Sequence, residues 1–493
     1  MFTSLSKSRV NLPMIAKVLG WLLIIEALFM AIPAITALWC GERAETWAFA
    51  LAAAITAITG LAACRIHPRY NDMGKREGFL LTALVWIVFS LFGMLPMIFS
   101  PFSHMSVTDA FFEAMSGFTT TGASLIDTTH PIPKSIHIWR CLSQWIGGMG
   151  IILFTLAVIP MLNHSGGMQM FNAEVTGITH DKIRPRISQT AKSLWGVYII
   201  LTLLSMIMLW AGPMDLFDAA CHAMSTLSTG GFSTTTEGID AWDSAYVKIV
   251  LTIFMFLGGV NFSLIYHTAT GRLNYIRDNE TFRAYAIVVA VALGLFAIAI
   301  VAQGNSPSLT STIIDPLFQI VSAITSTGYT LAVFDDWGTM VLSVTLLLMF
   351  IGACAGSTSG GAKIDRLLLL CKYLHNELRR CIRPNAILPV RVNRRSVPVP
   401  IVDKVVAFLC FYMLLIVAGG IALTAFGVPL FDAFFAAFSC ISNTGLDAAI
   451  TGYGSNYMLI SDPGKWILAA LMLTGRLELY TVLILFSRSF WRK

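Results

Sequence analysis

Charge is scarce in this sequence. Only 12% of its 493 residues are Asp, Glu, Lys or Arg, whereas 56% are hydrophobic, and the mean hydropathy is +0.73. So few charges cannot cover the surface of a soluble protein of this length, which excludes a soluble chain with one large core. The many apolar runs instead indicate an integral membrane protein that crosses the bilayer several times.

Paired cysteines are also missing. The nine Cys are scattered, mostly within apolar runs, and no two are spaced as Cys-x-x-Cys. This argues for reduced cysteines that serve packing, and against a structural metal, a disulfide framework or redox chemistry. We expect no organic cofactor in this chain. Membrane topology explains the net charge of +6, so we expect no nucleic-acid partner.

One stretch of the sequence occurs four times. Its first copy begins at Asp109 and the others begin at Asp218, Asp315 and Asp432. In each copy the Asp is followed by Ser seven residues later, by Ser or Thr ten residues later and by Gly thirteen residues later. A single copy is compatible with an ordinary membrane loop, but four copies in the same register indicate an internal repeat.

Each copy predicts a short helix followed by an extended polar segment. Asp is a preferred helix N-cap, and Pro316 directly follows one of the four, where its missing N–H costs nothing. A helix from the Asp to the Ser has about two turns and a length of about 11 Å, so it enters a bilayer without crossing it. The closing Gly adds backbone freedom. We call the polar segments the candidate filter segments: Thr119, Thr120, Thr121 and Gly122; Ser228, Thr229, Gly230 and Gly231; Thr325, Ser326, Thr327 and Gly328; Ser442, Asn443, Thr444 and Gly445.

The four candidate filter segments predict a site for a dehydrated cation. Non-helical backbone at membrane depth is tolerated where it is buried in protein or lines water. Arranged around one axis, the segments would form a ring of backbone carbonyls, with the negative ends of the short helices directed at the ion.

Every repeat has the same plan: an apolar leading run, the short helix, a polar stretch and an apolar trailing run. Two more apolar runs, 19–39 and 47–64, precede the first repeat. We predict an all-α polytopic membrane protein with ten spanning and four re-entrant helices, forming four pore repeats around a pseudo-fourfold axis plus two extra N-terminal helices. The predicted trailing runs are 142–162, 247–266, 340–371 and 466–486. The predicted units are a helix pair (1–77) and pore repeats 1 (78–181), 2 (182–278), 3 (279–395) and 4 (396–493).

The distribution of Lys and Arg predicts the orientation. If the N-terminus is cytoplasmic, the inside segments hold 25 of the 33 Lys and Arg. The positive-inside rule therefore predicts that both termini are cytoplasmic and that the candidate filter segments open outward. The inside segment 371–404 alone holds eight Lys and Arg, which indicates a docking surface for a soluble partner or for anionic membrane lipids.

The third trailing run contains an eleven-residue tract without a large side chain, 352–362, directly followed by Lys363. Its four glycines and three Ser or Thr favour an unwound loop beside a wet cavity. The alternative is a helix whose small residues Gly352, Gly356 and Gly360 pack closely against a neighbour.

A single Arg, Arg476, lies near the middle of the last apolar run. Intramembrane charge is costly and marks a candidate functional site. Arg476 either forms a buried ion pair, with Glu478 or with another helix, or places a positive charge below the candidate filter segments. The candidate gate residues are Gly352, Gly356, Gly360, Gly361, Lys363 and Arg476.

Several motifs together resemble the Trk/Ktr/HKT superfamily of potassium transport subunits, in particular its long TrkH-type branch. The resemblance covers nearly the whole chain and departs at Gly230 and Asn443, which stand where Thr is expected. The motifs are SGFTTTGA from Ser116, QWIGGMG from Gln144, RPRISQTA from Arg184, HAMSTLSTGGFS from His222, GACAGSTSGG from Gly352, NAILPV from Asn385 and GRLE from Gly475.

The resemblance implies a bacterial inner-membrane protein that forms a homodimer with one pore per subunit. K+ is then the transported ion, and the four closing glycines set its selectivity. The third-repeat tract is then an intramembrane gating loop that acts with Arg476, and a cytoplasmic nucleotide-binding ring of the TrkA/KtrA kind is the regulator.

The expected function is therefore potassium uptake through a gated filter, without enzymatic activity. Two alternatives are compatible with the sequence: cation-coupled potassium symport, and a pore that is permeable to sodium or ammonium. A transporter of another small solute fits the fourfold polar filter less well. An intramembrane enzyme built on Ser357, Ser359 and His375 lacks a base placed near either Ser.

Overall fold

The structure is a computed structural model that describes residues 10–68, 73–102, 105–126, 132–150, 187–235, 237–302, 310–331, 337–446, 457–477 and 479–491. These residues are mostly helical, which confirms the predicted fold class. The only strands among them form a small antiparallel hairpin of β1 (Arg391–Val392) and β2 (Arg395–Ser396).

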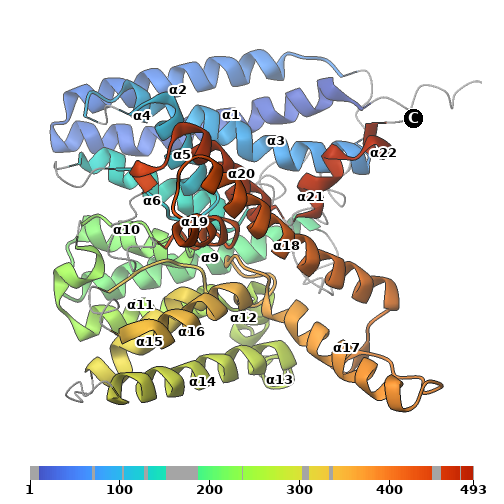
Figure 1. Ribbon diagram of the computed structural model, residues 1–493. Coiled ribbons are helices and arrows are strands. Elements are labelled where there is room, and N and C mark those ends of the chain that lie inside the picture. The colour runs from blue at the N-terminus through green and yellow to red at the C-terminus, as the bar shows by residue number, and fades with distance from the viewer. Residues whose placement is uncertain are drawn as a thin grey trace, which may run out of the picture.

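Six helices of the described chain are long and apolar enough to cross a membrane. Apolar side chains lie all around them, as expected for helices that face lipid on one side and protein on the other. Figure 1 shows the helix pair α1 and α2 on one side of the bundle and α14 on the opposite side. The spanning helices are α1 (Leu12–Cys40), α2 (Arg43–Cys64), α3 (Lys75–Gly93) continued by α4 (Leu95–Phe99), α9 (Ile187–Trp210), α14 (Glu280–Ala302) and α18 (Val399–Ala425).

The four short helices predicted from the repeat are present, although the predicted N-cap is wrong. The caps are Ser106 and Asp215 in the first two repeats, and their side chains accept from the backbone N–H of Asp109 and Asp218. The repeated Asp instead occupies the first turn, where a carboxylate is favoured by the helix dipole. The short helices are α5 (Val107–Phe118), α10 (Leu216–Leu227), α15 (Asp315–Ile324) and α19 (Leu430–Ile441).

Three of the trailing runs are interrupted helices in the described chain. The predicted continuous runs 247–266 and 466–486 are wrong, because their two parts are bent by 103° and 112°. Counting each bent pair as one span gives up to eight spans in the described chain, and residues 151–162 of the first trailing run lie outside it. The trailing helices are α6 (Lys134–Gly148), α11 (Ala245–Gly258) with α12 (Phe262–Ala269), α16 (Gly338–Ile351) with α17 (Ile364–Ile382), and α20 (Asp462–Arg476) with α21 (Tyr480–Leu483).

Glycine allows the trailing helices to approach the short helices. The first and fourth trailing helices carry glycine where they pass the C-terminal end of a short helix: a Cβ atom on Gly147 would lie 1.8 Å from the carbonyl oxygen of Phe118, and one on Gly475 would lie 2.0 Å from that of Ile441. Any side chain there would push the trailing helix away from the centre of the bundle. In the described chain the trailing helices of the second, third and fourth repeats are interrupted, whereas the sequence suggested an interruption for the third repeat only.

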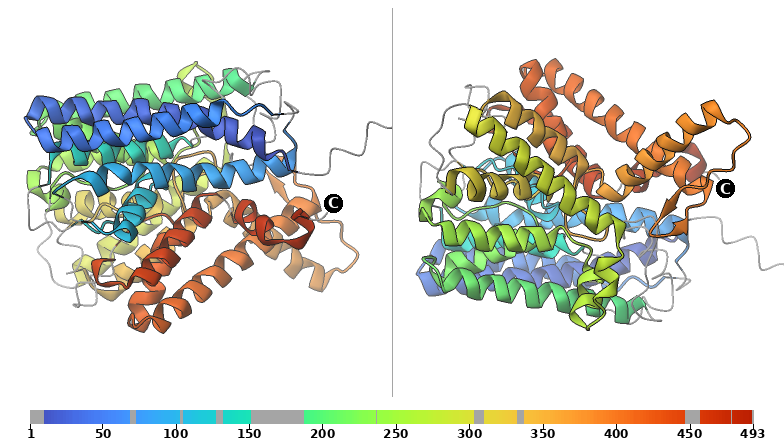
Figure 2. Two further views of the ribbon diagram at one scale, coloured as in Figure 1. Left: turned by 90° about the horizontal axis from the view of Figure 1, so that it is seen from above. Right: turned by 90° about the horizontal axis from the view of Figure 1, so that it is seen from below.

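The smaller elements lie at the ends of the bundle. Figure 2 shows α17 and the β-hairpin projecting from the end where the C-terminus lies. The elements are η2 (Gly238–Trp242), α13 (Asn274–Arg277), the π-helical turn η3 (Thr310–Ile314), η6 (Tyr457–Leu459), η7 (Ile484–Phe486) and α22 (Arg488–Trp491).

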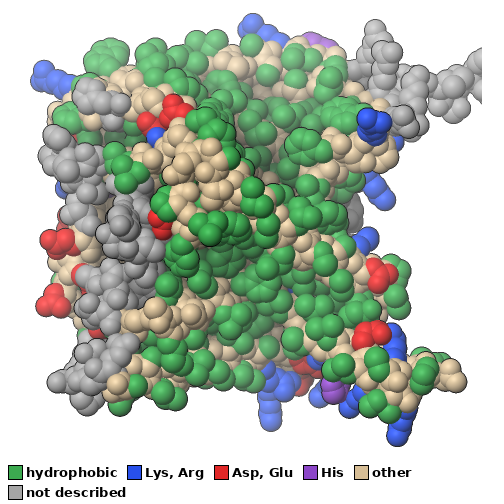
Figure 3. Space-filling model, viewed as in Figure 1, with side chains coloured by type: hydrophobic (Ala, Val, Ile, Leu, Met, Phe, Trp, Pro, Cys, Tyr) green, Lys and Arg blue, Asp and Glu red, His purple; other side chains and the backbone are tan. Residues whose placement is uncertain are grey.

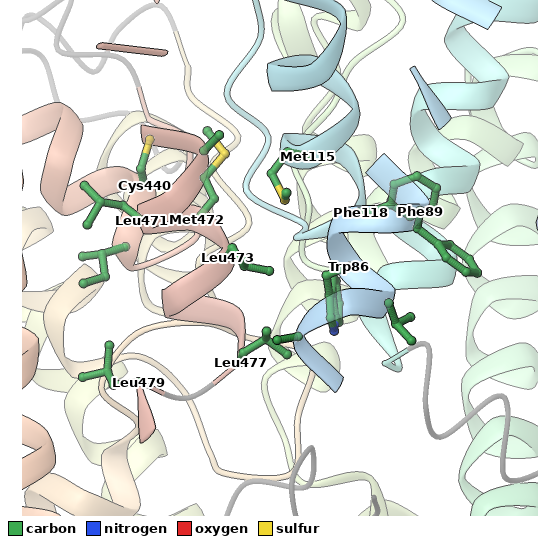
Figure 4. Packing of buried hydrophobic residues seen from close by; sticks show 14 of the residues in the cluster. Trp86, Phe89, Met115, Phe118, Cys440, Leu471, Met472, Leu473, Leu477 and Leu479 are labelled. Atoms are coloured by element: carbon green, nitrogen blue, oxygen red, sulfur yellow. The ribbon is translucent and has the colours of Figure 1, made fainter. Parts of the chain in front are cut away.

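Two large apolar clusters hold the bundle together. One joins the N-terminal helix pair to the first and fourth repeats, and the other joins the second and third repeats. Figure 4 shows part of the first cluster, where Trp86 and Met115 lie opposite Leu473 and Leu477 of the last repeat. The first and last repeats are thus neighbours in space, as a closed ring of four requires.

The surface matches a membrane setting. Figure 3 shows apolar side chains across the middle of one face, and most of the Lys and Arg visible there gather toward the end with the C-terminus. Large apolar residues such as Trp39, Leu203 and Ile298 are exposed, as expected for helix faces in contact with lipid.

Candidate functional site

The four candidate filter segments share one backbone conformation. Each begins at the C-terminal end of a short helix. Its second residue is left-handed, with φ between 53° and 55° at Thr120, Thr229, Ser326 and Asn443. Its third residue donates its backbone N–H to the carbonyl of the repeated Ser at 2.9 to 3.0 Å in all four copies. The internal repeat of the sequence is therefore a repeat of backbone geometry.

The closing glycines bring the four segments together in a ring. Their φ angles lie between 68° and 85°, a region that side chains disfavour. Each glycine also abuts the next segment, because an added Cβ atom would lie only 2.0 to 2.1 Å from a carbonyl oxygen there. The contacts run from Gly122 to Gly230, from Gly231 to Thr327, from Gly328 to Thr444 and from Gly445 to Thr121. Each segment thus contacts the next, and the fourth contacts the first, so the four segments form a closed ring.

Side-chain hydroxyls fix the segments from behind. In three of them the first and third residues pair their hydroxyls, at 2.8 Å for Thr119 with Thr121, 2.8 Å for Thr325 with Thr327 and 2.9 Å for Ser442 with Thr444. The side chains of the ring are at most 1% exposed. A ring that is buried and hydrogen-bonded in this way holds its carbonyls in fixed positions.

The two departures from the repeat have their own partners. Asn443 donates to the hydroxyl of Thr121 at 3.0 Å and to the carbonyl of Met472 at 2.9 Å, so it ties the fourth segment to the first. Gly230 lies against the side chain of Gln144 from α6. Sequence reasoning missed Gln144 as a site residue, because its contact with the second repeat depends on the tertiary fold.

The third-repeat tract is an unwound loop. Residues 352–363 have no helical structure, and φ is left-handed at Gly352, Gly356, Gly361 and Lys363, with values between 66° and 76°. The predicted loop is confirmed, and the alternative of a close-packed helix face is wrong. We call residues 352–363 the intramembrane loop.

The intramembrane loop is tied to three repeats. The N–H of Gly360 donates to the hydroxyl of Ser326 at 2.6 Å, and the N–H of Gly361 donates to the carbonyl of Ser442 at 3.0 Å. The hydroxyl of Thr358 donates to the carbonyl of Leu227 at 3.0 Å. The loop thus lies directly against the ends of the short helices and the candidate filter segments.

Arg476 connects the intramembrane loop to the first repeat. Its guanidinium donates to the carbonyl of Thr358 at 2.6 Å and to the carbonyls of Gly147 and Gly148, each at 2.7 Å. Gly147 and Gly148 end α6 and Thr358 lies in the unwound loop, so the Arg bonds carbonyls that have no partner within a helix. The predicted meeting of the tract and Arg476 is observed. Glu478, the other partner considered, lies outside the described residues.

A small cationic cavity lies beside the loop. Its volume is about 100 Å³, and Lys363, Arg366 and Arg476 line it together with Trp86 and several glycines. Lys363 donates to the carbonyl of Ser359 within the loop, and the guanidinium of Arg366 lies 4.0 Å from the ring centre of Phe408. Positive charge in so confined a place opposes the passage of a cation.

Two further residues that the sequence did not single out hold the loop. Asn261 donates to the carbonyl of Ala355 at 2.7 Å, and Asp365 accepts from the N–H of Ala355 at 2.5 Å and from the hydroxyl of Thr281 at 2.8 Å. Asp365 follows the tract closely in sequence, and this proximity could have identified it as a residue that holds the loop. No sequence pattern marks Asn261, because it lies in another repeat.

Other chemistry finds little support in the described residues. Within them, no group of three or more His, Cys, Asp and Glu is placed to hold a metal ion. The hydroxyls of Ser357 and Ser359 donate to backbone carbonyls of the loop. The loop serines thus act as structural donors.

Comparison with known proteins agrees with this architecture. The sequence profile of the family described as TrkH, cation transport protein, matches residues 46–493. The chain is 37% identical to the Trk system potassium uptake protein TrkH of Escherichia coli K12, over 97% of this chain and 99% of that protein. It is 31% identical to the Trk system potassium uptake protein TrkG of the same strain, over 96% of this chain and 97% of that protein.

A solved structure is similar over the whole length. The crystal structure of the potassium transporter TrkH from Vibrio parahaemolyticus superposes with a TM-score of 0.88 and 32% sequence identity, covering 98% of this chain and 100% of that one. The family consists of transport proteins, not enzymes. With its profile matched over residues 46–493, the chain belongs to the TrkH family of cation transport proteins.

Proposed function

We propose that this protein takes up potassium across the cytoplasmic membrane of a bacterium. The observation that carries the proposal is the closed ring in which each closing glycine abuts a carbonyl of the next candidate filter segment. The names of its relatives, Trk system potassium uptake proteins, support potassium as the ion.

The ring has the chemistry needed for a dehydrated monovalent cation. Backbone carbonyls replace the hydration shell of the ion. The buried hydroxyl pairs hold these carbonyls in place, so that they do not move inward to bind a smaller ion. The C-terminal ends of α5, α10, α15 and α19 lie immediately before the ring and contribute negative potential. All sixteen residues of the four candidate filter segments are assigned to ion binding.

The intramembrane loop and Arg476 form the gate of the proposed pore. A guanidinium 4 Å from a K+ ion repels it by about 4 kcal/mol at an effective dielectric constant of about 20. Opening requires the loop to leave the ring and Arg476 to release the three carbonyls that it binds. Lys363 and the glycines at 352, 356 and 361 have the left-handed backbone of the loop, and Gly360 lies too close to the carbonyl of Ser442 for a side chain. We assign these five residues to the gate together with Arg476.

A cytoplasmic nucleotide-binding ring is the proposed regulator. The helix α17 begins at Ile364, directly after the loop, and leads to the β-hairpin that projects from the bundle. The basic side chains along α17 and the hairpin offer an attachment surface. A pull on α17 would therefore act on the loop without any intermediate element.

Orientation and assembly complete the proposal. We assign both termini to the cytoplasm, because the inside segments then hold 25 of the 33 Lys and Arg. The proposed assembly is a homodimer in which each subunit has its own pore, surrounded by membrane lipid.

The test is ion flux into liposomes that contain the purified protein. We expect K+ to enter faster than Na+, with NH4+ as a weaker competitor, and to do so without a proton or sodium gradient. Equal entry of K+ and Na+ would contradict a potassium filter. A strict requirement for a gradient of H+ or Na+ would instead identify a coupled symporter.

A further inference from the structure

One of the four candidate filter segments is built differently from the rest. Thr121, Thr327 and Thr444 are the third residues of their segments, and each pairs its hydroxyl with the first residue. The second segment has Gly230 at this position and so has no hydroxyl to pair. A structural substitute is needed if this segment is to be held as firmly as the others.

The side chain of Gln144 occupies the place of the missing side chain. A Cβ atom on Gly230 would lie 2.3 Å from the amide carbon of Gln144, 2.5 Å from its Oε1 and 2.7 Å from its Nε2. Gln144 comes from α6 of the first repeat and is fully buried. The first repeat therefore completes the filter segment of the second.

Both ends of the carboxamide of Gln144 are used. Its Nε2 donates to the carbonyl of Gly230 at 2.7 Å. Its Oε1 accepts from the hydroxyl of Ser225 at 2.8 Å and from the N–H of Phe232 at 3.4 Å. Gln144 thus joins the short helix before the segment, the segment itself and the stretch of chain after it.

The sequence differs at both of these positions together. We call the pairing of a trailing helix with the filter segment of the next repeat a junction. Gln144 lies three residues before Gly147, and the residues three before the corresponding glycines of the other trailing helices are Met255, Met349 and Met472. Three junctions therefore combine Met on the trailing helix with Thr in the next segment, and one combines Gln with Gly. At the junction of the fourth and first repeats, Asn443 bonds both Met472 and Thr121, so these two positions are close in space.

The carbonyl that Gln144 binds belongs to the ring. The oxygen of Gly230 faces Gly122 in the cycle of glycine contacts. Within the described chain, no side chain donates to the equivalent carbonyls of Thr121, Thr327 and Thr444. The donated hydrogen bond therefore fixes the direction of one ring carbonyl and places the positive end of an N–H dipole beside its oxygen, which distinguishes it from the other three.

We propose that Gln144 is a specificity-determining residue that positions the carbonyl of Gly230 and thereby sets the choice between K+ and Na+. This inference rests on the proposed function, because it concerns the same ring. Gln144 acts through Gly230 and does not itself contact the ion. The proposed filter then has three segments that are held by their own hydroxyl pairs, and one segment that is held by a side chain of the neighbouring repeat.

Three variants separate hydrogen bonding from packing. Gln144→Met keeps the volume and removes both ends of the carboxamide. Gly230→Thr places a side chain where Gln144 already lies, so it should damage the site. The double variant Gln144→Met with Gly230→Thr recreates the Met and Thr combination of the other three junctions. Each is purified, checked for folding by its melting temperature, and tested for K+ and Na+ flux in liposomes.

We expect the ratio of K+ to Na+ flux to fall about fivefold in Gln144→Met, the factor that corresponds to one neutral hydrogen bond of ordinary strength. The double variant should recover most of the wild-type ratio. Met255→Leu, a packing change at an equivalent position, serves as the comparison and should change the ratio far less.

The outcomes are distinct from those that test the proposed function. A wild-type protein without K+ preference would refute the potassium filter itself. A selective wild-type protein whose Gln144→Met variant is folded and equally selective would overturn the role of Gln144. If Gln144→Met does not fold, the double variant decides: a folded double variant with low selectivity overturns the inference, and one with recovered selectivity supports it.

Discussion

The guanidinium of Arg476 donates to the backbone carbonyl of Thr358 at 2.6 Å, so a charge from the last repeat is bonded to the loop of the third. The same guanidinium reaches the carbonyls of Gly147 and Gly148 in the first repeat. One side chain thus links three repeats below the ring. An Arg that donates to three carbonyls holds this arrangement through charge-assisted hydrogen bonds, and its positive charge opposes a cation in the proposed pore.

Replacing Arg476 should therefore open the pore. We expect Arg476→Ala, and separately a deletion of residues 357–359, to raise K+ flux measured without any regulator by more than about tenfold, because a barrier of several kcal/mol is removed. Liposome flux of the purified variants measures this. Wild-type or lower basal flux in two folded variants would show that the loop is a packing surface and Arg476 a structural residue.

Replacing a closing glycine should relax selectivity. Ser at Gly122, Gly231, Gly328 or Gly445 has to adopt a left-handed φ and meets a carbonyl oxygen within 2.1 Å, so the ring must distort. We expect a clear fall in the K+ to Na+ flux ratio of each variant. Gly196→Ser is the matched control, since an added Cβ atom there meets nothing within 4 Å. Unchanged selectivity in all four ring variants would remove the ring from ion selection.

Neutralising the basic end of the third repeat should weaken regulator binding. Arg379, Arg380, Arg394 and Arg395 lie on α17 and the hairpin. Changing all four to Gln should lower the affinity for a cytoplasmic nucleotide-binding ring in detergent, where bilayer lipid is absent. The control changes Arg272 and Arg277, which lie on a different segment assigned to the cytoplasm. Undiminished binding would favour anionic lipid as the partner of this surface.

A buried ion pair between repeats should contribute strongly to stability. Lys248 of α11 bonds Asp315 of the next short helix at 2.9 Å, and both side chains are 9% exposed. Lys248→Met should destabilise the protein by about 3 kcal/mol, because it leaves an unpaired buried carboxylate. Thermal unfolding in detergent measures the change.

The double variant Lys248→Met with Asp315→Asn should recover part of that loss, because it removes the more buried carboxylate. Asp240, which also lies 3.4 Å from Lys248, stays charged but is 25% exposed, so it limits the recovery only partly. Lys372→Met is the comparison, since its pair with Glu280 is about a third exposed (35% and 32%) and is expected to contribute less than about 1 kcal/mol. Equal losses at the two sites would argue against a special role for the buried pair.

The sequence by itself determined the class of the protein and the fourfold repeat, and it favoured the unwound loop. Low charge and long apolar runs leave a polytopic membrane protein as the outcome. Four copies of one spacing specify four short helices with polar ends, and the low helix propensity of a tract rich in glycine and Ser or Thr favoured a loop over a close-packed helix. These features are local in the chain, so local physics is enough to predict them.

The tertiary structure decided which residues meet. The breaks in the other trailing helices and the contact of Gln144 with Gly230 depend on neighbours from elsewhere in the chain. The same is true of Arg476, whose depth the sequence indicated but whose three carbonyl partners it did not. A contact between residues more than 80 positions apart is fixed by packing around a common axis, and no periodicity in the chain records it.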